Sequence, residues 1–135
     1  EITQQIELAS TIESLTKTEQ FIETVCEKYA FGEDTYGNIL IAITEAVNNA
    51  ITHGNQLDLT KKVLLSMTAT TSEVQFIVQD EGNGFDYNNI PDPTLPENIE
   101  KNNGRGVFLM KALADKVEFE DNGKSLIINF SLSKS

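Results

Sequence analysis

A carboxylate and a carboxamide stand one helical turn apart in the middle of the chain, at Glu45 and Asn49. An α-helix advances by about 100° per residue, so positions four apart share one face, and His53 extends the same polar ridge. A carboxamide oxygen can bind Mg²⁺ without adding charge, and a carboxylate one turn earlier can accept a proton from an attacking hydroxyl. The spacing is common in helices, so it indicates phosphoryl transfer only together with further groups. For His53, hydrogen bonding at the helix end is the simpler interpretation.

A glycine-rich turn follows later in the chain. Asp80 ends an apolar, strand-like segment and is followed by Gly82 and Gly84. A carboxylate at this place can accept a hydrogen bond from the amino group of adenine, and the glycines allow the backbone to approach a nucleotide closely. The same sequence also suits an ordinary tight turn, and the residues alone leave both interpretations open.

A third glycine-rich segment, Gly104-Arg105-Gly106, precedes a predicted helix. The first turn of a helix presents free N–H groups and a partial positive charge, which suit phosphate groups. Arg105, with Lys101 and Lys111, adds cations to an otherwise acidic chain. A flexible loop that enters a helix is the alternative interpretation. One ATP molecule could contact all three segments, so their order is more informative than any single match.

Strands are predicted on both sides of the second segment. The predicted strands are 4–12, 61–69, 73–80, 116–120 and 124–132. Apolar and polar residues alternate in the two central ones, which is typical of strands with one buried face. The Asn-Gly pair at 122–123 favours a type I′ turn between the last two strands.

Helices are predicted at 16–30, from about 34 to 53, and at 106–114. Thr16 and Glu19 have the spacing of a capping box at the start of the first helix. Asp34 or Thr35 is expected to cap the second helix, which carries Glu45 and Asn49.

A long irregular loop separates the second and third glycine-rich segments. All three prolines of the chain lie within residues 86–103, and loops of this length are often functional lids. Together with the elements above, residues 1–135 are predicted to form one α+β domain. Its helices should cover one face of a mostly antiparallel sheet.

The composition suits a globular domain with a strong acidic balance. The chain has 135 residues, of which 39% are hydrophobic, and a net charge of −11. A field of this sign opposes nucleic-acid binding, and it opposes ATP binding unless Mg²⁺ and local donors are present. Capture of a basic protein partner and plain solubility are both open explanations for the charge. The single cysteine, Cys26, excludes an internal disulfide and is expected to pack as a small apolar residue.

Membrane and export signals are not indicated. No apolar run approaches the roughly 20 residues that span a bilayer. The first residues also lack the basic and then apolar pattern of a secretory leader, so a cytoplasmic protein without a membrane partner is expected. The P-loop and protein-kinase motifs are missing from the sequence, and ATP would have to be held by another arrangement.

The three segments, in this order, resemble the motifs of the GHKL (histidine kinase-like) ATPases. Within that superfamily the chain is most similar to the anti-sigma-factor serine kinases of the RsbW and SpoIIAB type. Their patterns E-A-x-x-N-A-x-x-H-G and D-x-G-x-G are matched at 45–54 and 80–84. Their pattern G-x-G-L-x-L-(M/I) resembles residues 104–110, where Val107 replaces the usual Leu. The resemblance covers nearly the whole chain and implies the Bergerat fold, a two-layer α/β sandwich.

The resemblance also implies roles for individual residues. Glu45 would be the catalytic base, Asn49 the Mg²⁺ ligand and Asp80 the adenine anchor. The remaining nucleotide-binding residues would be Gly82, Gly84, Gly104, Arg105, Gly106 and Ser125. Many relatives carry Gly-Thr where this chain has Lys124-Ser125; Ser125 keeps the hydroxyl that would lie near adenine.

The resemblance implies a protein kinase that works as a regulatory switch. It would bind ATP and Mg²⁺, phosphorylate a serine of a STAS-type anti-sigma factor antagonist, sequester a sigma factor, and form a homodimer. A nucleotide-sensing binding module without kinase activity is a second hypothesis. A detached histidine-kinase catalytic domain is a third; it would need an upstream phosphoacceptor histidine, and no histidine precedes His53 in this sequence.

Overall fold

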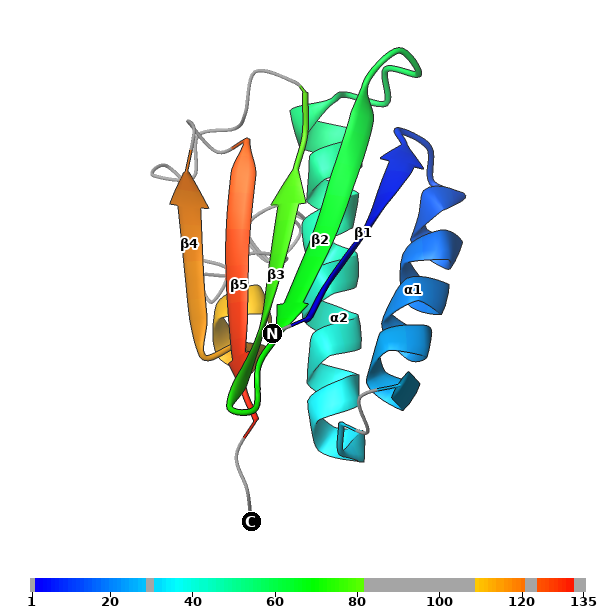
Figure 1. Cartoon of the computed structure of the whole chain (residues 1–135). Helices are drawn as coiled ribbons and strands as arrows, with labels where there is room; N and C mark the ends of the chain where they lie inside the picture. The colour runs from blue at the N-terminus through cyan, green and yellow to red at the C-terminus, as the bar shows by residue number, and fades with distance from the viewer. Residues whose placement is uncertain (1, 29–30, 82–108, 121–123, 133–135) are drawn as a thin grey trace, which may run out of the picture.

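A computed structural model of the chain describes residues 2–28, 31–81, 109–120 and 124–132. These residues form a five-stranded sheet with the strand order β1-β2-β3-β5-β4. Helices pack on one face of the sheet (Figure 1). The predicted fold class, an α+β sandwich with a mostly antiparallel sheet, is confirmed.

The elements follow one another closely along the chain. In order they are β1 (Ile2–Ala9), α1 (Ser14–Lys28), α2 (Glu33–Asn49), the π-helical turn η1 (Ala50–Gly54), β2 (Lys62–Ala69), β3 (Glu73–Gln79), β4 (Lys116–Glu120) and β5 (Ser125–Ser131). A short helical segment also covers residues 109–113. All four strand pairs are antiparallel.

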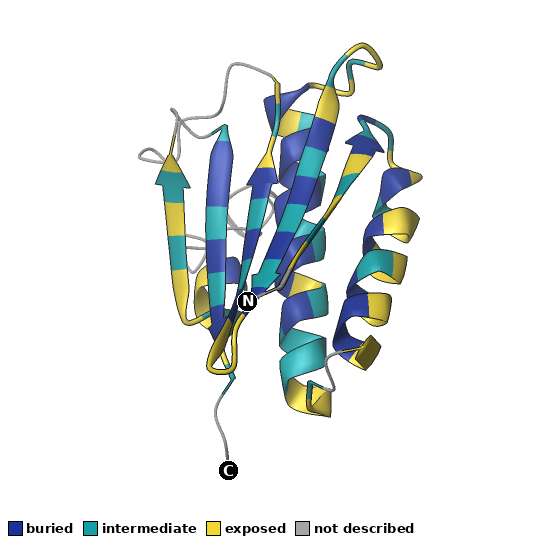
Figure 2. Cartoon of the chain, viewed as in Figure 1, coloured by how far each residue is buried: buried dark blue, intermediate teal, exposed yellow. Residues whose placement is uncertain are grey.

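Alternating side chains of the central strands form the inner face of the sheet. Val63, Leu65 and Met67 of β2 have no exposed surface, and Val74 and Phe76 of β3 are equally buried. Figure 2 shows this two-residue period as alternating bands along the central strands. Because successive side chains of a strand point to opposite faces, the buried set faces the helices, as the sequence predicted.

Helix α2 contributes the opposing apolar stripe. Ile39, Ile43 and Val47 have no exposed surface and belong to the same core cluster as the sheet residues. Cys26 of α1 is also buried, as expected, and burial raises the pKa of its thiol to about 11. The thiol is therefore protonated and unreactive at neutral pH.

Both predicted helix caps are wrong. Helix α1 begins at Ser14, so Thr16 lies inside the first turn instead of at a cap. Residues 10–13 connect β1 to this helix, and the hydroxyl of Ser14 donates back to the carbonyl of Ala9 at 2.7 Å. Helix α2 begins after Gly32, and no side chain caps it. Asp34 lies in its first turn, where a negative charge interacts favourably with the helix dipole.

The predicted end of the second helix near His53 is confirmed, but its last turn is wider than an α-helix. In η1 the N–H of Asn55 donates to the carbonyl of Ala50 at 2.8 Å, a five-residue step. The chain then reverses through Gln56 and Leu57, whose φ angles are 54° and 60°. Non-glycine residues rarely adopt this left-handed conformation, so strain is concentrated just beyond the helix.

Replacement of Gln56 with glycine is expected to increase stability. Gln56 is exposed, and removing its Cβ relieves a left-handed conformation that costs about 1–2 kcal/mol, less the backbone entropy that glycine adds to the unfolded chain. The net gain should be about 1 kcal/mol and should raise the Tm by roughly 4 °C. Thermal unfolding followed by circular dichroism measures it. Gln20→Gly, on the exposed face of α1, is the control and should lower the Tm. If both variants lowered the Tm equally, the conclusion that Gln56 is strained would be wrong.

Candidate nucleotide-binding site

The end of the first motif and the head of the second are in direct contact. A Cβ atom placed on Gly54 would lie 2.3 Å from Oδ2, 2.5 Å from Cγ and 2.9 Å from Oδ1 of Asp80. The Asp80 carboxylate therefore occupies the space that any side chain at residue 54 would need. Glycine is required at Gly54 by this close approach and not by a left-handed φ.

The start of the last strand is the third part of this site. The backbone N–H of Asp80 donates to the carbonyl of Lys124 at 2.9 Å. One residue away, Gln79 Nε2 donates to the hydroxyl of Ser125 at 3.3 Å, and Ser125 is buried. The ends of η1 and β3 and the start of β5 thus meet at one end of the molecule (Figure 1).

Asn49 is buried one helical turn before this contact. Asn49 is only 3% exposed. The Nδ2 of its side chain has no hydrogen-bond partner among the described residues. A buried polar group without a partner costs roughly 1–3 kcal/mol, and such groups require an explanation such as a bound ligand, ion or water. Glu45, one turn earlier on α2, is half-buried. The predicted carboxylate–carboxamide pair is therefore partly withdrawn from bulk solvent.

The donor set fits a Mg²⁺ ion that arrives with a nucleotide. Within the described ranges, no group of three or more His, Cys, Asp or Glu side chains could hold a metal ion. Mg²⁺ is usually bound by one or two protein oxygens together with phosphate oxygens and waters, and seldom by a complete protein cage. The Asn49 side-chain oxygen can supply such a single protein ligand.

Five of the predicted nucleotide-binding residues lie outside the described part of the chain. They are Gly82, Gly84, Gly104, Arg105 and Gly106, and the proposed lid over 86–103 lies outside it as well. Their roles stay predictions. From the following helical segment, Met110 is fully buried and Leu113 packs against the core.

Two residues at the end of η1 were not singled out from the sequence as parts of the site. Gly54 is the last residue of the first motif, and it lies against the Asp80 carboxylate. Asn55 belongs to none of the three motifs, although its side chain is buried. The adjacent Gly-Asn pair was the available signal, since glycine permits close approach and asparagine offers both a donor and an acceptor.

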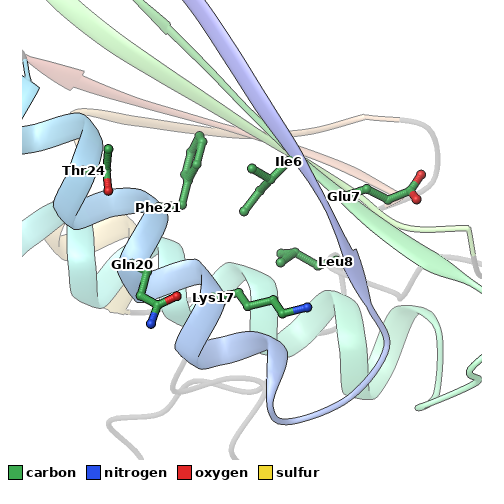
Figure 3. Close-up of a pocket in the computed structure, with 7 residues that line it drawn as sticks. All are labelled: Ile6, Glu7, Leu8, Lys17, Gln20, Phe21 and Thr24. Atoms are coloured by element: carbon green, nitrogen blue, oxygen red, sulfur yellow. The ribbon is translucent and has the colours of Figure 1, made fainter.

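A separate hollow lies between α1 and the edge strand β1. It has a volume of about 360 Å³, and its lining includes the apolar side chains of Ile6, Leu8 and Phe21 (Figure 3). Charged side chains of Glu7 and Lys17 lie beside them. None of its lining residues belongs to the three motifs, so this hollow is distinct from the candidate nucleotide site.

No helix in the described parts of the chain is both long enough and apolar enough to cross a bilayer.

The chain belongs to the histidine kinase-like ATPase domain family, whose model matches residues 8–130. This match confirms the resemblance that the three motifs indicated.

Among curated proteins, the chain is similar to two proteins named serine-protein kinase RsbW. The Bacillus licheniformis protein is 26% identical over 119 residues, which are 82% of this chain and 73% of that protein. The protein of Bacillus cereus strain AH820 is 26% identical over 111 residues, which are 77% of this chain and 69% of that protein.

Among solved structures, the chain is similar to the crystal structure of the RsbU and RsbW domains of Rv1364c from Mycobacterium tuberculosis. The TM-score is 0.68 and the sequence identity is 15%, with 97% of this chain covered. The chain spans about a third, 32%, of that longer protein. At this identity, the likeness shows a shared fold.

Proposed function

We propose that this chain is a serine/threonine protein kinase of the anti-sigma-factor type, which binds ATP with Mg²⁺. The observation that carries this function is the contact of the Asp80 carboxylate with Gly54, which joins two motifs into one site. Membership of the histidine kinase-like ATPase family and the similarity to proteins named serine-protein kinase RsbW support it.

Each described site residue has a role that its chemistry allows. Asp80 accepts a hydrogen bond from the adenine amino group, and the buried Ser125 lies beside the same strand end. Asn49 offers a neutral oxygen ligand, and Glu45 accepts the proton of the attacking serine hydroxyl. When bound, Mg²⁺ neutralises charge on the phosphates. That neutralisation is needed in a chain with a net charge of −11.

The same proposal extends to features that lie beyond the described residues. Residues 1–135 act as one ATPase domain, with a lid at about 86–103 that is followed by the glycines and Arg105 of the third motif. The protein substrate is a STAS-type anti-sigma factor antagonist, and the alternative partner is a sigma factor that is held until the antagonist competes. The protein acts in the cytoplasm as a homodimer.

A transfer assay tests the kinase function. The purified chain is incubated with radiolabelled ATP, Mg²⁺ and a panel of STAS-domain proteins, and the labelled residue is identified. Phosphoserine or phosphothreonine on a panel member is the expected result. Binding of ATP without transfer to any member would leave a nucleotide-sensing binding module instead. Label on a histidine of the longer gene product would point to a histidine-kinase catalytic domain.

Asn49→Ala is expected to weaken MgATP binding at least tenfold with little loss of stability. The variant removes the oxygen ligand, a loss of one charge-assisted contact, while the Nδ2 of Asn49 makes no hydrogen bond to any of the described residues. Calorimetry with Mg²⁺ and with excess chelator separates the two contributions. The loss should vanish when Mg²⁺ is removed, and the neighbouring Asn48→Ala should show none. An equal loss in both conditions would remove Asn49 from the metal site.

A further inference from the structure

The buried side chain of Asn55 connects three segments that are distant in sequence. Asn55 is 1% exposed. Its Nδ2 donates to the hydroxyl of Ser10 at 2.9 Å and to the carbonyl of Lys62 at 3.0 Å. Its Oδ1 accepts from the backbone N–H of Glu81 at 2.8 Å. One carboxamide thereby joins the end of η1 to the β1–α1 connection, the start of β2 and the residue after Asp80.

Neighbouring groups reinforce the same arrangement. The hydroxyl of Ser10 donates to the carbonyl of Lys61 at 2.6 Å. The backbone N–H of Lys62 donates to the side-chain Oε2 of Glu81. Glu81 is therefore held twice, by its backbone N–H through Asn55 and by its side chain through β2.

These contacts fix the backbone on both sides of the Asp80 carboxylate. The N–H of Asp80 itself is bonded to Lys124, and the next N–H, that of Glu81, is bonded to Asn55. The first bond anchors the turn to β5, and the second anchors it to the helix end that carries Gly54. Loss of the second bond would leave the turn held on the side of Gly54 only through the Glu81 side chain and its bond to Lys62.

Backbone conformation does not explain why asparagine stands at this position. Asparagine is favoured where the chain becomes left-handed, but Asn55 has φ −88° and ψ −9°. The left-handed angles fall on the next two residues, Gln56 and Leu57. Strain of this kind persists only where surrounding contacts enforce it, and it is concentrated at functional sites. A backbone bond from the Leu57 N–H to the carbonyl of Ile51, at 2.8 Å, closes this turn, and the side-chain hydrogen bonds of Asn55 hold the residue just before it.

We infer that Asn55 is a positioning residue for adenine recognition, an inference that rests on the proposed nucleotide binding. It holds the peptide after Asp80 against the helix end, so that the carboxylate is aligned before the nucleotide arrives. Preorganisation of this kind matters because a small displacement of an acceptor removes most of a hydrogen bond's directional energy. The expected specificity is for adenine over hypoxanthine, whose ring presents an acceptor where adenine presents an amino donor.

The test compares Asn55→Ala with Ser10→Ala. Asn55→Ala removes the bond to Glu81, so the Glu81 amide should exchange its hydrogen faster. MgATP affinity should be at least tenfold weaker, and the preference for MgATP over MgITP should be reduced. Ser10→Ala leaves the Asn55–Glu81 bond in place. It should lower the Tm, yet keep Glu81 protected and the nucleotide preference unchanged. A residue that only stabilised the fold would give the same nucleotide results in both variants.

Three outcomes would overturn the inference while leaving nucleotide binding intact. The first is free exchange of the Glu81 amide in the wild-type chain, which needs no variant. The second is unchanged MgATP affinity and preference in Asn55→Ala. The third is equal loss of preference in both variants. If Asn55→Ala is too unstable alone, it is measured in the Gln56→Gly background against Gln56→Gly itself. A wild-type chain that binds no MgATP would instead refute the proposed function.

Discussion

Glu45→Gln is expected to lower the rate of phosphoryl transfer to the protein substrate by about 10²–10⁴-fold, the usual contribution of a general base. Glutamine keeps the shape of glutamate but cannot take up the proton of the attacking hydroxyl. MgATP affinity should change by less than about twofold, because the role proposed for Glu45 is proton acceptance from the attacking hydroxyl and not contact with the nucleotide. Single-turnover transfer and calorimetric MgATP binding, measured on the same preparation, separate the two effects.

Glu33→Gln is a suitable control for this variant. Glu33 lies in the first turn of the same helix and is exposed, so its replacement removes the same charge far from Glu45 along α2. It should leave transfer and binding unchanged. Transfer at the wild-type rate by Glu45→Gln would show that another group accepts the proton.

Gly54→Ala is expected to weaken MgATP binding by about 100-fold, which corresponds to roughly 2.7 kcal/mol. The added methyl would lie within 3 Å of three side-chain atoms of Asp80, so the carboxylate has to leave its position. Overpacking of this kind costs about 1–3 kcal/mol, partly offset by the better helix propensity of alanine. The fold should therefore survive while the adenine acceptor is misplaced. Calorimetry gives the affinity, and thermal unfolding gives the stability.

Gly37→Ala is the matched control for that prediction. Gly37 lies in α2, and a Cβ placed there would meet nothing within 4 Å. The substitution should raise stability by up to about 1 kcal/mol through helix propensity and leave MgATP binding unchanged. Equal MgATP affinity of the two alanine variants would show that the Gly54–Asp80 contact does not matter for the nucleotide.

Local patterns in the sequence were sufficient for most of the fold. The alternation of apolar and polar residues over β2 and β3 indicates that one face of these strands is buried, because successive side chains of a strand point to opposite faces. The helical segment predicted from about 34 to 53 corresponds to α2 and most of η1. The antiparallel pair of β4 and β5 agrees with the Asn-Gly signal between them, although residues 121–123 lie outside the described part of the chain.

The helix starts were harder to predict, because competing hydrogen bonds decide them. Thr16 has capping-box spacing, yet the helix had already begun where the Ser14 hydroxyl could reach the end of β1. Asp34 and Thr35 are good capping residues, yet the chain enters α2 through Gly32 without a side-chain cap. The start of each helix depends on tertiary contacts, which the capping preferences of single residues do not predict.

The candidate site was predicted by residue type but not by contact. Glu45, Asn49 and Asp80 were identified because their chemistry and order match a nucleotide-binding family. The approach of Asp80 to Gly54 joins residues that are 26 positions apart, and only the packed structure shows it. The Asn55 bonds to Ser10, Lys62 and Glu81 likewise join segments that no local pattern relates.

Calorimetric titration of the wild-type chain with MgATP, in parallel with MgITP, tests the central claim most directly. One MgATP should bind per chain, and MgITP should bind at least tenfold more weakly, because its carbonyl oxygen would face the Asp80 carboxylate without a proton to share. A folded chain that releases no heat with MgATP, or that binds both nucleotides equally, would contradict an adenine site at Asp80.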